Sequence, residues 1–165
     1  MRRSTYLVAV GSNRAGRYGG PSAEVAAALR LLGGVASPII ASAPVGPSTR
    51  TFANAAAVIE SDEVPAALLA RLKAIERAFG RQRGRRWGAR VLDLDIILWS
   101  GGRVDTRDLT VPHPAFRARA FVLTPALAIV PDWRDPVTGH TIRQLHARLT
   151  SRRPIPRSRE RCWGP

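Results

Sequence analysis

The chain of 165 residues has the length of one globular domain, and 45% hydrophobic residues are enough for a core. No apolar run approaches the roughly 18 residues of a membrane-spanning helix, so we expect no membrane partner. The net charge is +14, from 26 basic and 12 acidic residues, and Lys73 is the only lysine. Either an anionic partner, such as nucleotide phosphates or nucleic acid, or a general preference for arginine would account for this charge.

The first half of the chain is expected to contain strands and helices in mixed order. Residues 5–10, 35–43 and 52–60 predict strands, because they are rich in apolar and β-branched side chains. The short apolar stretch near the N-terminus is read as the first of these strands and not as a signal peptide. A helix is predicted over 21–32, with a proline in its first turn and Gly33 after its end.

The second half continues this mixture. Residues 61–63, followed by a proline, predict the start of a second helix that ends at Gly80. The later elements are expected to be a strand over 91–99, a short strand near Val104, a partly helical stretch over 114–128 and a helix over 141–149. Strands and helices do not alternate strictly, which favours an α+β fold over a doubly wound sheet. We expect one domain over 1–150 and a basic, disordered tail over 151–165.

The segment VLDLDIILW at 91–99 carries the strongest functional signal. Side chains of a strand alternate between its two faces, so Asp93 and Asp95 share one face about 7 Å apart. Two carboxylates on an otherwise apolar strand repel each other and lose hydration, and a divalent cation such as Mg²⁺ relieves both problems. Two surface aspartates on a solvent-facing strand are the alternative interpretation.

A basic loop, RQRGRRWGAR at 81–90, precedes that strand. Arginine side chains match the oxygens of a nucleoside triphosphate, whose metal ion the aspartates would hold. The alternative is a solvated charged loop. His113 lies between two prolines and is a candidate phosphate donor, although a lone histidine is more often structural. Glu76 is predicted to face the core, with an arginine of this loop as its partner.

Five segments of the chain form a joint pattern: VAVGSN at 8–13, APVGP…FAN at 43–54, IE…GR at 75–81, RWGARVLDLDIILW at 86–99 and LTVPHPAFRARAFVLTPALAIVPDW at 109–133. Together they resemble the 6-hydroxymethyl-7,8-dihydropterin pyrophosphokinase family of folate biosynthesis. The resemblance implies a ferredoxin-like α+β sandwich, with a mainly antiparallel central sheet flanked by helices. It also implies transfer of the pyrophosphoryl group of ATP to the hydroxymethyl group of the pterin, with release of AMP.

The resemblance further implies the roles of individual residues. It makes Asp93 and Asp95 the ligands of two Mg²⁺ ions that accompany ATP, and it gives catalytic roles to Arg81, Arg90 and Asp95. The residues implied to bind ATP are Arg81, Arg83, Trp87, Arg90, Thr110, His113 and Arg119. Those implied to bind the pterin are Ser42, Ala43, Val45, Phe52, Asn54, Trp87 and Phe121. Lys73 departs from the pattern, since a glutamine is common at its position.

Partners other than ATP and the pterin are not expected. The predicted protein is a cytoplasmic monomer that binds neither nucleic acid nor membrane, and its single cysteine, Cys162, fits a reducing compartment. Two other functions remain as alternatives. A nucleic-acid-binding module on a ferredoxin-like sheet would account for the positive charge, and a metal-dependent sugar-nucleotide transferase would account for the paired aspartates.

Overall fold

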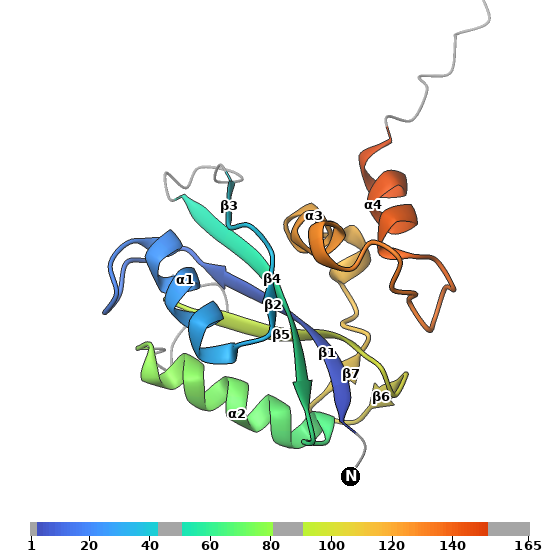
Figure 1. The fold of residues 1–165 in the computed structure, drawn as a ribbon, viewed down its shortest axis with the longest axis horizontal. Coiled ribbons are helices and arrows are strands. Elements are labelled where there is room, and N and C mark those ends of the chain that lie inside the picture. The colour runs from blue at the N-terminus through green and yellow to red at the C-terminus, as the bar shows by residue number, and fades with distance from the viewer. Residues whose placement is uncertain (1–2, 43–50, 81–90, 152–165) are drawn as a thin grey trace, which may run out of the picture.

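The structure is a computed structural model that describes residues 3–42, 51–80 and 91–151. Its strands are β1 (Ser4–Ser12), β2 (Val35–Ala36), β3 (Ile40–Ser42), β4 (Phe52–Ser61), β5 (Asp93–Trp99), β6 (Val104–Asp105) and β7 (Thr110–Val111). Its helices are α1 (Pro21–Leu32), α2 (Pro65–Ala78), the 3-10 turn η1 (Phe116–Ala118), α3 (Ala120–Ile129) and α4 (Ile142–Thr150). Figure 1 shows how these elements surround the long strands β1, β4 and β5.

The central sheet has the strand order β2–β4–β1–β5, and β3 also pairs with β4. Every pairing in it is antiparallel. In chain order these elements are β1, α1, β2 and β3, β4, α2 and β5. If β2 and β3 are taken as one interrupted strand, this chain order and the strand order of the sheet are those of a ferredoxin-like fold. The structure therefore confirms the expected α+β class with a mainly antiparallel sheet.

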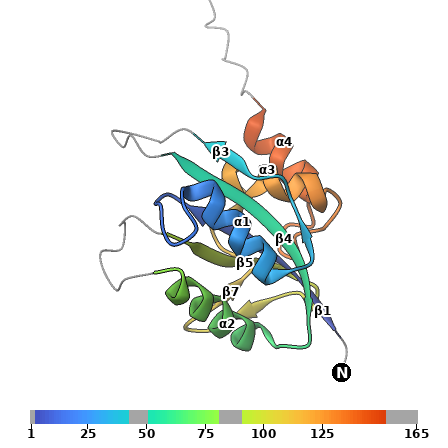
Figure 2. The same cartoon turned by 60° about the vertical axis from the view of Figure 1, so that its left-hand side comes forward.

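Helices cover both faces of the sheet (Figures 1 and 2). On one face, Tyr6, Val8 and Val10 of β1 are buried in a core that also receives apolar side chains of α1 and α2. On the other face, Leu7 of β1 belongs to a second core with side chains of η1, α3 and α4. Alternation along β1 thus supplies side chains to both cores, and the described helices on the second face are η1, α3 and α4.

The strand predicted over 35–43 is interrupted, which corrects that prediction. The structure has β2 and β3 in its place, both on the same edge of β4. Between them, Ser37 is buried, and its backbone N–H donates to the Ala56 carbonyl at 2.9 Å. The Ser37 hydroxyl accepts from the Ala56 N–H, also at 2.9 Å. Pro38 follows without an N–H of its own, so the ladder stops for a few residues and resumes at β3.

Three other boundaries differ from the predictions. Helix α2 begins at Pro65, because the Ser61 hydroxyl accepts from the Glu63 N–H at 3.1 Å and forms a separate turn before the helix. The strand predicted over 91–99 begins at Asp93. The stretch predicted over 114–128 divides into η1 and α3. The last helix agrees closely, because Thr141 and Gln144 form a capping box at its start.

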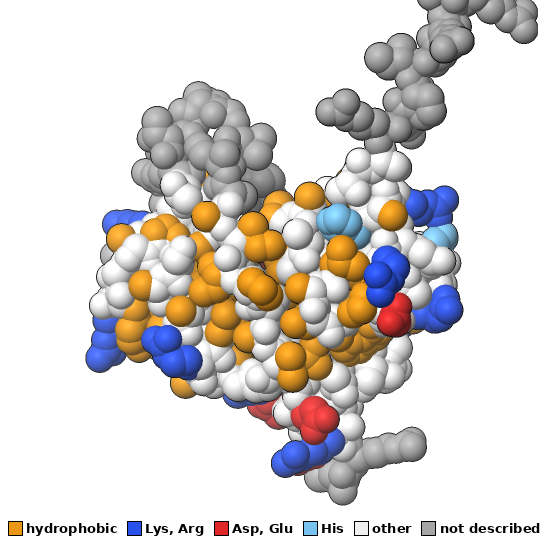
Figure 3. All heavy atoms as spheres, turned by 45° about the horizontal axis from the view of Figure 1, so that its top comes forward, with side chains coloured by type: hydrophobic (Ala, Val, Ile, Leu, Met, Phe, Trp, Pro, Cys, Tyr) orange, Lys and Arg blue, Asp and Glu red, His pale blue; other side chains and the backbone are white. Residues whose placement is uncertain are grey.

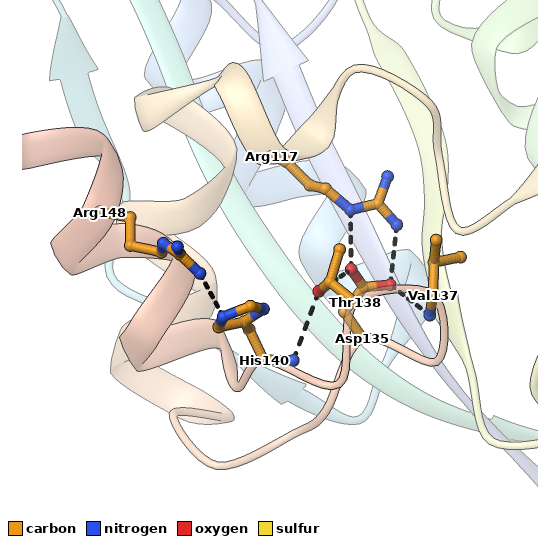
Figure 4. Close-up of polar contacts among 6 residues, drawn as sticks. All are labelled: Arg117, Asp135, Val137, Thr138, His140 and Arg148. Carbon is orange, nitrogen blue, oxygen red and sulfur yellow. Dashed lines mark hydrogen bonds and ion pairs between the residues drawn. The ribbon is translucent and has the colours of Figure 1, made fainter.

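One buried carboxylate ties the segment before α4 to η1 (Figure 4). Asp135 is fully buried and accepts from Arg117 Nε at 2.7 Å and Nη2 at 2.8 Å. The Thr138 hydroxyl at 2.6 Å and the Val137 N–H at 3.1 Å also donate to it. Burial alone would raise the pKa of Asp135, but these hydrogen bonds outweigh burial and lower it from 3.8 to about 2.

We predict that Asp135→Asn lowers the free energy of unfolding by about 2 kcal/mol at neutral pH. A carboxylate whose pKa is lowered by folding stabilises the protein above its unfolded pKa, and that contribution disappears as pH falls from about 4 to about 2. The variant should therefore lose part of the wild type's pH dependence in that range, measured by urea unfolding at several pH values. Asp132→Asn is the control, since Asp132 is 82% exposed. Equal effects of the two variants would contradict the prediction.

Candidate functional site

Two carboxylates lie side by side on β5. Asp93 and Asp95 are half-buried, whereas Leu94 and Ile96 between and after them are buried in the core that faces α1 and α2. The strand therefore presents both carboxylates on the opposite face, which is the face that α3 and α4 also occupy. This is the shared face that the alternation of the sequence predicts.

A transverse row of residues links these carboxylates to an amide. Asp93 of β5 pairs with Gly11 of β1, and Gly11 pairs with Asn54 of β4. A β-carbon at Gly11 would lie 3.2 Å from Asn54 Oδ1, which is tighter than ordinary contact. A larger residue would therefore fit at this position only if the amide moved by a few tenths of an ångström. This role of Gly11 was not predicted from the sequence. Strand alternation does place Gly11 on the same face of β1 as Ala9, two residues before it.

His113 is held beside the carboxylates by its own backbone. Its N–H donates to the Ile97 carbonyl at 3.0 Å, which fixes the residue against β5. The ring Nδ1 accepts from the Ala115 N–H at 3.2 Å, so in the neutral ring the proton is on Nε2. Sequence analysis singled out this histidine but not its tautomer.

The charges around His113 show which groups are its neighbours. Burial lowers its pKa, the carboxylates of Asp95 and Asp93 raise it, and the Arg119 guanidinium lowers it, with a net lowering. The imidazole is therefore neutral at pH 7, and Nε2–H is available as a hydrogen-bond donor. His113, Arg119 and the two aspartates, which are far apart in the sequence, form one electrostatic cluster.

One of the two aromatic candidates, Phe121, contacts this cluster through Arg119. Arg119 is the N-cap residue of α3, and its guanidinium lies 5.7 Å from the centroid of the Phe121 ring. Phe121 is 48% exposed. Phe52, which is half-buried, lies two residues before Asn54 on the same face of β4, and its backbone pairs with Ser42.

The remaining candidates are Thr110 and several residues outside the described ranges. Thr110 is exposed on β7, and its hydroxyl donates to the Asp105 carboxylate at 3.2 Å. The candidates outside the described residues are Ala43, Val45, Arg81, Arg83, Trp87 and Arg90. Glu76 faces the core as expected, and its described partners are Lys73 and the Leu94 N–H; the arginines predicted to pair with it are among the residues not described.

The donor set fits a hard cation that brings further ligands with it. No group of three or more His, Cys, Asp or Glu side chains suited to a metal occurs in the described ranges. Two half-buried carboxylates supply oxygen ligands and leave the other coordination positions to water or phosphate, the usual arrangement for Mg²⁺. None of the described helices is both long and apolar enough to cross a membrane.

Relatives of known name share the sequence pattern. A protein 41% identical over 143 residues is the 2-amino-4-hydroxy-6-hydroxymethyldihydropteridine pyrophosphokinase of Pseudomonas aeruginosa, with 81% of this chain and 85% of that protein covered. The enzymes of the same name from Synechocystis and Methylorubrum extorquens are both 43% identical. The match to the first covers 61% of this chain and 51% of the relative, and the match to the second covers 59% and 61%.

A solved structure shares the fold. The crystal structure of Plasmodium falciparum HPPK-DHPS matches with a TM-score of 0.60 and 13% identity, over 89% of this chain and 43% of that one. At this identity the likeness concerns the fold alone. The model of the 7,8-dihydro-6-hydroxymethylpterin-pyrophosphokinase family matches residues 7–131, which include the transverse row, both aspartates, His113 and Arg119. The chain therefore belongs to the 7,8-dihydro-6-hydroxymethylpterin-pyrophosphokinase family.

Proposed function

We propose that the chain is a Mg²⁺-dependent enzyme of the cytoplasm that transfers the pyrophosphoryl group of ATP to 6-hydroxymethyl-7,8-dihydropterin, giving AMP and the pterin diphosphate. The observation that supports this proposal is the row Asp93–Gly11–Asn54, in which a carboxylate and an amide lie on one face of the sheet, with Asp95 two residues further along β5 on the same face. Membership of the family supports it. The enzyme is proposed to act as a monomer through one domain, residues 1–150.

Asp93 and Asp95 would hold two Mg²⁺ ions that arrive with ATP. The chemistry that such ions supply is neutralisation of the phosphate charge and polarisation of the attacking hydroxyl. The aspartates themselves fix the site on a rigid strand whose other face is buried. Asp95 or Asp93 is also the candidate acceptor for the proton of the pterin hydroxyl, since each is half-buried and on the correct face.

The phosphate chain of ATP would extend from these carboxylates towards His113 and Arg119. The neutral His113 ring can donate Nε2–H to a phosphate oxygen while Ala115 keeps its orientation. Arg119 adds a full positive charge beside it. Thr110 and Trp87 complete the proposed ATP-binding set, together with the arginines Arg81, Arg83 and Arg90, of which Arg81 and Arg90 are proposed to act in catalysis.

The pterin would bind on the Asn54 side of the row. Its donor and acceptor edge needs fixed polar partners, and Asn54 is 91% buried beside Gly11. Phe52 is half-buried on the same face of β4 as Asn54, and Phe121 is 48% exposed on α3, so each is proposed to cover one side of the flat ring. Backbone and side-chain groups of Ser42, Ala43, Val45 and Trp87 are proposed to complete this part of the site.

Pyrophosphoryl transfer requires no covalent protein intermediate. Positioning of the hydroxyl against the β-phosphorus and neutralisation of the developing charge account for most of the catalysis in such reactions. The described cluster combines these requirements, because carboxylates for cations and donors for phosphate oxygens stand around one strand. The direct test is AMP formation from ATP and the hydroxymethyl pterin, with and without a chelator. Turnover that is indifferent to the chelator would refute the metal requirement.

The nucleic-acid-binding alternative gains little from the face drawn in Figure 3. On this face the described lysine and arginine side chains are separated from one another, and hydrophobic atoms occupy much of the middle. A nucleic-acid site would instead gather basic side chains into one stripe. A salt-dependent shift on RNA or DNA without ATP turnover would favour that alternative.

Asp95→Asn should lower kcat/KM by at least about a hundredfold, because it removes half of the anionic charge available to the metal ions. Asp62→Asn is the matched control, since Asp62 is exposed and follows the far end of β4. AMP release by chromatography measures both. Activity of the Asp95 variant within a few-fold of the control would contradict the metal-binding role.

Gly11→Ala should raise KM for the pterin about tenfold, because the new methyl group displaces the Asn54 amide from its partners. The Mg²⁺ concentration that gives half-maximal activity should stay the same, since the methyl group approaches the amide and not the carboxylates. Gly20→Ala is the control, because a β-carbon there has no heavy atom within 4 Å. If the Gly11 variant changed only the response to Mg²⁺ and not KM for the pterin, the prediction would be contradicted.

A further inference from the structure

The strand that carries the two aspartates is an edge strand. Among the described residues, β1 is the only strand that pairs with β5. The outer edge of such a strand normally leaves its backbone N–H and C=O groups to water or to a covering element. At Leu94, which separates Asp93 from Asp95, both groups are instead engaged by side chains of α2. Glu76 Oε1 accepts from the Leu94 N–H at 2.8 Å, and Lys73 Nζ donates to the Leu94 carbonyl at 3.2 Å.

These two side chains also bind each other. Lys73 Nζ lies 2.7 Å from Glu76 Oε1, and the two residues are three positions apart on α2. The Glu76 side chain is fully buried and that of Lys73 is 31% exposed. Leu68 and Leu72 of α2 are buried in the core, so the helix that carries the ion pair is held in place by packing. A carboxylate buried to this extent needs its cation, so both side chains are held in one arrangement.

We propose that Lys73 and Glu76 are positioning residues for the carboxylate pair, and that they set the spacing of Asp93 and Asp95 by holding the peptide groups of Leu94 between them. This inference rests on the proposed metal-binding function of the aspartates. Rotation of either peptide group of Leu94 would turn one carboxylate relative to the other. Strand β1 pairs with this segment along its inner edge, and the ion pair holds the same peptide groups from the outer edge, where no described strand pairs with β5. Groups that orient metal ligands in this way typically change metal affinity about tenfold or more when removed.

The test uses a double variant, Lys73→Met with Glu76→Leu, in the full chain. Apolar residues of similar size can replace a buried ion pair without loss of stability, so this variant is expected to fold. Titration with Mg²⁺ in the presence of α,β-methylene-ATP, followed by calorimetry, should show half-saturation at about tenfold higher Mg²⁺ than in wild type. Hydrogen exchange of the Leu94 amide should accelerate in parallel, because its acceptor is gone.

Glu76→Gln provides a second variant if the double variant is unstable. Its amide oxygen can still accept from Leu94, but the ionic bond that holds Lys73 at the Leu94 carbonyl is lost, so the half-saturating Mg²⁺ concentration should rise here too. Arg71→Met is the matched control, because Arg71 also forms an ion pair from α2, but with Glu63 before the helix, with Nε 2.8 Å from the carboxylate. An unchanged Mg²⁺ half-saturation in a folded variant overturns the inference, whatever the activity. Absence of AMP formation by wild type overturns the proposed function, while the calorimetric comparison still decides the role of Lys73 and Glu76. No Mg²⁺ binding by wild type in the presence of nucleotide overturns both.

Discussion

Leu94 and Ile96 are buried between the sheet and the helices α1 and α2, and their burial decides which face of β5 carries the aspartates. Each such side chain contributes about 1.5–3 kcal/mol when it leaves water. A shift of the strand by one residue would expose these apolar groups and bury two carboxylates, at a cost of several kcal/mol for each charge. The register of β5, and with it the whole candidate site, is therefore fixed by packing on the face opposite to the chemistry.

Local patterns made much of this predictable from the sequence. Alternation along β5, the glycine after α1 and the helix near the C-terminal end each depend on residues within a few positions of one another, and all three appear in the structure. The resemblance to a family, which the comparisons confirmed, depended on a combination of such patterns. Pro38 could also be read from the sequence. Its effect, the interruption between β2 and β3, depends on how this segment pairs with the edge of β4.

Contacts between segments far apart in the chain could not be predicted from local sequence patterns. Arg117 and Asp135 are 18 positions apart, and nothing near either one indicates the other. Glu76 was expected to need a partner, but the hydrogen bond that it accepts from Leu94 depends on how α2 lies along β5. The space that Gly11 leaves for Asn54 likewise exists only once two strands are paired. The candidate residues could be chosen from the sequence, whereas their orientation required the fold.

The interruption between β2 and β3 also affects whether this edge of the sheet can pair with a strand of a second molecule. An unbroken outer strand along β4 would offer a regular line of backbone donors and acceptors to the same strand of another molecule, the usual starting point of edge-to-edge aggregation. Ser37 turns its hydrogen bonds inward to Ala56, and Pro38 has no donor to offer. At the other end of the sheet, side chains of α2 occupy the backbone of β5 at Leu94. Over the residues that the structure describes, neither border of the sheet is thus a regular template for a further strand.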